Sequence, residues 1–102
     1  MNFDFDMNLY KVFYVVAKNN SFSKAADELF VTQPSVSYSI KQLEDRLNTK
    51  LFKRNHKGIR ITPEGKEVFE YVKKSYNDIS VGERGLKENR DLKTGKISIG
   101  VQ

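Results

Sequence analysis

The spacing of apolar residues predicts three short helices in the first half of the chain. Apolar side chains recur at helical spacing over residues 7–18, between Asp6 as an N-cap and a pair of asparagines. A second helix is expected over residues 24–29, after a run of hydroxyl caps. A third begins behind Thr32 with a proline in its first turn and ends near Asn48. Its buried stripe is expected to comprise Val36, Ile40, Leu43 and Leu47.

A short β-hairpin is predicted between the third helix and the second half of the chain. Residues 51–61 contain two short stretches with apolar positions, and these flank a polar tip that ends in Gly58. Thr62-Pro63-Glu64 then gives a strong helix start, because it supplies a hydroxyl cap, a proline at the first position and an acid in the first turn.

The pattern after the hairpin predicts one long helix that runs to about Asp91. Its apolar and small residues alternate in steps of three and four, as in a coiled-coil seam formed by Gly65, Val68, Val72, Ser75, Ile79, Gly82 and Leu86. So long a helix cannot pack fully on a small domain, so we expect it to pair with the same helix of a second chain. An ordinary core stripe is the alternative explanation of this spacing. The alternating residues near the end, 97–101, predict a strand that needs a partner, so we expect the chain to be the front of a longer protein.

The charge distribution changes this picture by suggesting a polyanionic partner. The chain has 18 Lys and Arg against 13 Asp and Glu, a net charge of +5. Residues 50–60 contain bases and no acid, the bases being Lys50, Lys53, Arg54, Lys57 and Arg60. Such a run is also compatible with an ordinary solvated face.

The composition excludes several classes of site and of location. Cysteine is absent from the sequence, which excludes disulfides and thiolate metal sites. A single histidine, His56, makes no metal site without neighbouring ligands, so we expect no cofactor. No apolar run approaches the roughly 20 residues that span a bilayer, and the N-terminus lacks a secretory pattern. We therefore expect a cytoplasmic protein without a membrane partner.

A short helix, a tight turn and a longer helix with a polar face form a helix-turn-helix arrangement. In this arrangement the second helix enters the DNA major groove and the first braces it. The face over residues 33–42 carries Gln, Ser, Tyr and Lys side chains, which hydrogen-bond to base edges and phosphates. The basic hairpin that follows is where a wing would touch flanking phosphates.

These motifs, in this order and spacing, resemble the signature of LysR-type transcriptional regulators. The matching positions are Ser21-Phe22-Ser23-Lys24-Ala25-Ala26, Leu29, Thr32-Gln33-Pro34-Ser35-Val36-Ser37, Ile40, Leu43-Glu44, Leu51-Phe52, Arg54, Ile61, Thr62-Pro63 and Gly65. The resemblance implies a mainly α fold, a winged helix-turn-helix of three helices plus a small β-hairpin wing, followed by a long linker or dimerisation helix. It divides the chain into a DNA-binding domain over 1–61, a linker helix over 62–91, and a hinge with the first strand of an effector-binding domain over 92–102.

The resemblance also implies which residues bind the partner, double-stranded DNA with a partly palindromic operator. Gln33, Pro34 and Ser37 match positions that meet bases and backbone in the major groove, and Arg54 and Lys57 match basic positions near the minor groove. The remaining implied DNA contacts are Ser23, Thr32, Ser35, Tyr38 and Lys41. Dimerisation would use Val68, Val72, Ser75, Ile79, Gly82 and Leu86 of the linker helix, and the intact proteins of this family are often tetramers.

Three positions depart from the family pattern. Tyr38 stands where the family often has arginine, so a guanidinium contact to guanine is lost and base preference there differs. Asn20 and Asn48 replace customary glycines. Asparagine can take the place of glycine there because it tolerates positive φ.

Two other functions compete with sequence-specific binding. One is a dimerisation or scaffolding module whose wing binds nucleic acid without sequence preference. The other is an enzyme, for which the sequence gives little support because it has no cysteine, no partnered histidine and no phosphate-cradling glycine loop. We expect that the chain is not an enzyme.

Overall fold

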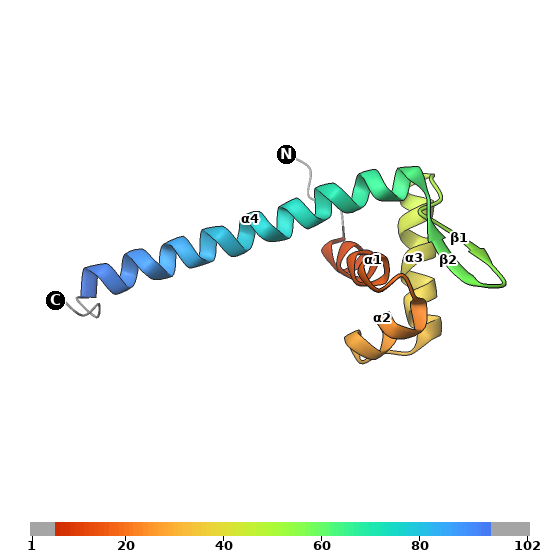
Figure 1. Ribbon diagram of the computed structural model, residues 1–102, viewed down its shortest axis with the longest axis horizontal. Coiled ribbons are helices and arrows are strands. Elements are labelled where there is room, and N and C mark those ends of the chain that lie inside the picture. The colour runs from red at the N-terminus through yellow and green to blue at the C-terminus, as the bar shows by residue number, and fades with distance from the viewer. Residues whose placement is uncertain (1–5, 95–102) are drawn as a thin grey trace. The chain divides into compact units, whose positions relative to one another are not determined.

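The computed structural model describes the backbone of residues 6–94 and the side chains of residues 6–90. Its elements follow the order α1 (Met7–Asn19), α2 (Phe22–Leu29), α3 (Gln33–Leu47), β1 (Phe52–Asn55), β2 (Gly58–Ile61) and α4 (Pro63–Thr94) (Figure 1). The predicted fold class is confirmed, with three helices, a two-stranded hairpin and a long helix after it. The chain divides into two units, with the boundary between Val72 and Lys73 inside α4.

Helix α2 begins at Phe22, earlier than the predicted Lys24. Ser21 is its N-cap, with an extended backbone and with Oγ accepting a hydrogen bond from the backbone N–H of Lys24 at 3.0 Å. The first hydroxyl of the run therefore caps the helix, and Ser23 lies exposed inside its first turn. This start places the Phe22 side chain in the core, where it is buried.

Three helices end on residues in the left-handed conformation. Asn20 and Asn48, both with φ of 52°, confirm that asparagine serves where glycine is customary. Phe30, with φ of 57°, ends α2 in the same way and was not predicted, because phenylalanine seldom adopts this conformation. Its backbone N–H donates to carbonyl oxygens of the preceding helical turn, and its side chain is 94% exposed.

The core joins α1, α2, α3 and the start of the hairpin. Its largest fully buried side chains are Phe13, Leu43, Leu51, Val16 and Val36. The Phe52 ring, at the start of β1, lies 5.6 Å from the Phe13 ring and 6.0 Å from the Phe22 ring, measured between centroids. Aromatic packing therefore fixes the hairpin to α1 and α2.

The hairpin is a regular antiparallel pair with a short turn. Phe52 pairs with Ile61 at its base, and Asn55 pairs with Gly58 at its tip. The Asn55 side chain accepts a hydrogen bond from the backbone N–H of Lys57 at 2.8 Å, and Gly58 has φ of 129°, a conformation that favours glycine. The sequence prediction of a hairpin over residues 51–61 is confirmed.

Three polar side chains link the ends of α1 and α2. Lys18 Nζ and Asn19 Nδ2 both donate to the Glu28 carboxylate, at 2.9 and 3.0 Å. These hydrogen bonds, first from Asn19 and then from Lys18, lower the pKa of Glu28 from its ordinary value. The hydrogen bond to Glu28 raises the pKa of Lys18.

The first turns of α4 belong to the same unit as the core. Val68, Phe69 and Val72 are half-buried and pack against the core, and the Phe69 ring stacks on Tyr14 at 5.4 Å. Two residues of the predicted dimerisation seam, Val68 and Val72, therefore contribute to the core of their own chain.

Beyond Val72, the described side chains of α4 are mostly exposed. They include Ile79, Val81 and Leu86, whose exposed fractions are 52, 49 and 69%. The helix extends to Thr94, past the predicted end at Asp91, so residues 92–94 are helical, whereas the strand predicted over 97–101 lies outside the described residues. None of the helices within residues 6–94 combines the length and hydropathy that a bilayer-spanning segment needs.

Candidate nucleic-acid interface

The N-terminal half of α3 presents most of the predicted DNA contacts to solvent. Thr32 caps the helix, its Oγ1 accepting a hydrogen bond from the Ser35 backbone N–H at 3.2 Å. The residues exposed along this face are Thr32, Gln33, Pro34, Ser35, Tyr38 and Lys41, whereas Ser37 is half-buried. A capped helix start with small polar side chains suits an approaching phosphate or base edge, because helix N-termini favour anions.

Two side-chain pairs order the middle of this face. Gln42 Nε2 donates to the Tyr38 hydroxyl at 3.2 Å, and Lys41 pairs with Asp45 at 3.6 Å. Tyr38 is 65% exposed, so its ring remains available to a ligand. Gln42, which was not among the predicted site residues, therefore orients the residue that departs from the family pattern.

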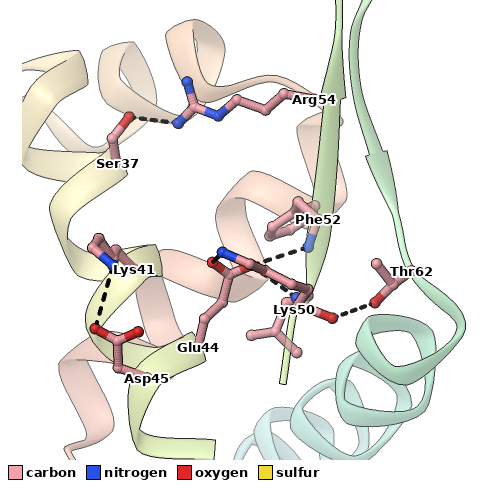
Figure 2. A network of polar contacts seen from close by, with 9 residues as sticks. Ser37, Lys41, Glu44, Asp45, Lys50, Phe52, Arg54 and Thr62 are labelled. Atoms are coloured by element: carbon pink, nitrogen blue, oxygen red, sulfur yellow. Dashed lines mark hydrogen bonds and ion pairs between the residues drawn. The ribbon is translucent and has the colours of Figure 1, made fainter. Parts of the chain in front are cut away.

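Glu44 anchors the hairpin to α3. Its Oε2 accepts hydrogen bonds from the backbone N–H groups of Leu51 and Phe52 at 2.8 and 3.2 Å, and its Oε1 lies 3.8 Å from Lys50 Nζ (Figure 2). At the other side of the hairpin base, the Thr62 hydroxyl donates to the Lys50 carbonyl at 2.7 Å. The wing is therefore held in a defined position beside α3.

Arg54 reaches from the wing back to α3. Its Nη2 donates to Ser37 Oγ at 3.0 Å (Figure 2). Its Cζ lies 4.2 Å from the centre of the Phe22 ring. One side chain of β1 thus touches both α2 and α3. The sequence identified Arg54 and Ser37 separately as DNA contacts, and the structure brings them together.

Two hollows lie beside Arg54 and are lined by several of the predicted DNA-contacting side chains. The first, of about 550 Å³, runs between α3 and β1 and is lined by Ser37, Lys41, Glu44, Lys50, Lys53 and Arg54 among others. The second, of about 430 Å³, includes Ser23, Gln33, Arg54 and Lys57 in its lining. Residues of α2, α3 and the wing, far apart in the sequence, therefore share one surface.

Lys50 and Lys53 are candidate contacts that the residue-by-residue prediction missed. Both line the hollow between α3 and β1, and both are exposed. The basic run over residues 50–60 already suggested contacts in this region. Only the folded structure shows which of its basic side chains face α3. With Lys41 and Arg54 they give this hollow a basic character that suits a phosphodiester backbone.

The predicted dimerisation residues fall into two groups. Val68 and Val72 are half-buried on the core of the first unit, whereas Ser75, Ile79, Gly82 and Leu86 are exposed in the second. The apolar residues Ile79 and Leu86 are therefore accessible to a partner helix.

Comparison with known proteins gives a family match over most of the chain. A family described as "Bacterial regulatory helix-turn-helix protein, lysR family" matches residues 7–66. The glycine cleavage system transcriptional activator of Escherichia coli (strain K12) is 41% identical over 80 residues, which cover 78% of this chain and 26% of that protein. The HTH-type transcriptional regulator CzcR of Bacillus subtilis (strain 168) is 38% identical over 90 residues, which cover 88% of this chain and 31% of that protein.

Solved structures show the same fold. The BenM_DBD/benA site 1 DNA complex has 30% identity and a TM-score of 0.74, covering 82% of this chain and 98% of that one. DarR of Vibrio fischeri in complex with DNA has 34% identity and a TM-score of 0.70, covering 90% of this chain and 31% of that one. The chain spans about a quarter to a third of the length of the curated relatives it matches. These relatives are named as transcriptional regulators, which confirms the expectation that the chain is not an enzyme.

Proposed function

The chain belongs to the lysR family of bacterial regulatory helix-turn-helix proteins, which are DNA-binding transcription regulators, and on that premise we propose that it binds double-stranded DNA as a sequence-specific homodimer. Two recognition helices would enter successive major grooves about 34 Å apart, on a partly palindromic operator. Acting on bacterial DNA would place the chain in the cytoplasm. We assign DNA binding to residues 1–61 and dimerisation to the linker helix over 62–91.

The observation that carries this proposal is the convergence of α2, α3 and the wing on one polar and basic surface. Gln33 and Ser37 offer side chains that exchange hydrogen bonds with base edges. Around them, Lys41, Arg54 and Lys57 supply the cations that a phosphate backbone attracts. Residues of α3 would specify the sequence, and residues of the wing would position the chain on the duplex.

Dimerisation is supported by the exposed apolar residues of α4. Ile79 and Leu86 lie seven positions apart, which is one heptad, and each is more than half exposed. Burial of these side chains against a second copy would remove apolar surface from water. The intact protein would form a tetramer, as intact proteins of this family often do.

Selection of binding sites from random duplex DNA at physiological salt tests the proposal. The purified chain is expected to enrich an inverted repeat, because a two-fold dimer presents the same surface to both half-sites. Gln33→Ala should bind with altered preference in the same assay. Binding without enrichment of any sequence would refute sequence specificity and favour the charge-driven, nonspecific module, for which Gln33→Ala would leave the selected pool unchanged.

A further inference from the structure

We propose that Arg54 is a positioning residue, which couples the wing to the recognition helix and fixes the Ser37 hydroxyl as a hydrogen-bond donor toward DNA. This inference rests on the proposed function, sequence-specific binding of DNA. The Arg54 and Ser37 pair would set the base preference at one position of each half-site, and Arg54 would also contribute its charge.

The contacts of the Arg54 guanidinium group hold it in a fixed orientation. Arg54 Cζ lies 4.2 Å from the Phe22 ring centre, while Nη2 lies 3.0 Å from Ser37 Oγ. Phe22 is itself fixed, because it is buried and its ring packs edge-on against Phe52. A guanidinium held between a rigid ring and a hydroxyl has a defined orientation, unlike a flexible surface cation.

The hydrogen bond from Arg54 leaves the Ser37 hydroxyl free to donate its own hydrogen to DNA. A serine hydroxyl has one hydrogen to donate and two lone pairs, one of which accepts a hydrogen bond from Arg54. Because that donor is a cation, it polarises the hydroxyl toward donation and makes the second lone pair a poorer acceptor. Among the residues that the structure describes, none accepts a hydrogen bond from Ser37. The arginine is a donor without an acceptor, so it leaves the serine hydrogen for another partner.

The donor character of Ser37 predicts which bases it prefers. In the major groove, guanine offers O6 and N7, adenine offers N7 and thymine offers O4 as acceptors, whereas cytosine presents the N4 donor. A hydroxyl fixed as a donor would therefore discriminate against cytosine at the contacted position. Because Arg54 contacts both Ser37 of α3 and Phe22 of α2, its loss would also loosen the wing relative to this position.

The Arg54→Lys substitution distinguishes the positioning role of Arg54 from the effect of its positive charge. Lysine keeps the charge but has neither the planar group that stacks on Phe22 nor the fork that reaches Ser37. Competition binding with the selected site and its cytosine variants should show about a tenfold loss of discrimination at one position in each half-site. The salt dependence of binding should stay unchanged, because the number of cations is the same.

Coupling of the two residues is the second readout. Ser37→Ala should lose the same discrimination, and the double variant Arg54→Lys with Ser37→Ala should lose no more than either single variant. Lys53→Ala is the matched control, because it removes a neighbouring wing cation and leaves the pair intact. It should reduce the salt dependence while keeping the base preference.

A measurement on the free chain tests the contact between Arg54 and Phe22 directly, even if a substitution impairs folding. In the NMR spectrum of the chain, the Arg54 side-chain signals should be shifted by the Phe22 ring current, and Phe22→Leu should abolish that shift. Unshifted signals in the unsubstituted chain would overturn the inference.

The outcomes distinguish this inference from the proposed function. Failure of the unsubstituted chain to enrich any sequence would overturn the proposed function and, with it, this inference. An enriched site that Arg54→Lys binds with unchanged preference, or additive losses in the double variant, would overturn the inference alone.

Discussion

The Glu44 carboxylate of α3 lies 2.8 Å from the backbone nitrogen of Leu51, and this contact fixes the base of the wing to α3. The same oxygen accepts from the Phe52 backbone N–H at 3.2 Å. The Glu44 side chain is only 11% exposed, so water does not readily replace it. One acidic side chain therefore contributes directly to holding the basic wing beside α3.

Glu44→Ala should destabilise the fold by about 2–3 kcal/mol, because it leaves two backbone N–H groups near the core without their acceptor. Urea unfolding followed by circular dichroism measures the loss. Lys50→Ala is the control, since it removes only an exposed ion pair worth at most about 1 kcal/mol. Equal losses from the two substitutions would contradict the anchoring role of Glu44.

Gly65→Ala should destabilise the fold by about 1–3 kcal/mol through overpacking. A Cβ at this position would overlap the Leu51 carbonyl oxygen and lie 2.7 Å from Ile61 Cγ1. Gly85→Ala in the same helix meets nothing within 4 Å, so it should raise the helix propensity and stabilise by up to about 1 kcal/mol. Thermal unfolding compares the two variants, and a Gly65→Ala chain as stable as the parent would disprove the close contact.

Lys57→Ala should weaken binding to all DNA sequences and lower the slope of log K against log salt by about one unit. Lys57 is exposed in the turn of the wing, where a phosphate can replace its water. Arg54→Ala should lower the slope similarly and also disturb base preference. Fluorescence anisotropy at several salt concentrations gives the slopes, and Lys57→Arg should retain the parent value. An unchanged slope in Lys57→Ala would remove this residue from the interface.

Tyr38→Arg should shift one position of each selected half-site toward guanine. The side chain is 65% exposed on α3, and arginine makes a bidentate contact to guanine O6 and N7 worth about 1–3 kcal/mol. Site selection with the variant measures the change. Tyr38→Phe serves as the control because it keeps the ring and removes only the hydroxyl that Gln42 contacts. If the arginine variant selects the parent sequence, position 38 does not face a base.

Ile79→Asp should convert the dimer to monomers in sedimentation equilibrium, because it places a charge in the proposed seam. Val81→Asp is the matched control, since Val81 is similarly exposed but lies outside the seam residues. A dimer that persists in Ile79→Asp, or dissociates only in Val81→Asp, would place the interface on another face of α4.

Local sequence specifies the helices and strands of this chain, their order and most of their ends. Helix caps at Asp6 and Thr32, and left-handed ends at Asn20 and Asn48, were predicted and are present in the structure. These features depend on hydrogen bonds within a few residues, so local sequence is sufficient to specify them. The family resemblance then followed from motifs whose spacing stayed intact over residues 7–66.

Which of these residues act together depends on the packing of distant segments. Arg54 and Ser37 are 17 residues apart, and their hydrogen bond exists because Glu44 and Phe22 hold the wing beside α3. The same holds for the seam of α4, whose alternating steps of three and four do not reveal that Val72 packs on the core while Ile79 is exposed. Periodicity gives the face of a helix on which a residue lies, but the partner on that face depends on packing between distant segments, which local sequence does not encode.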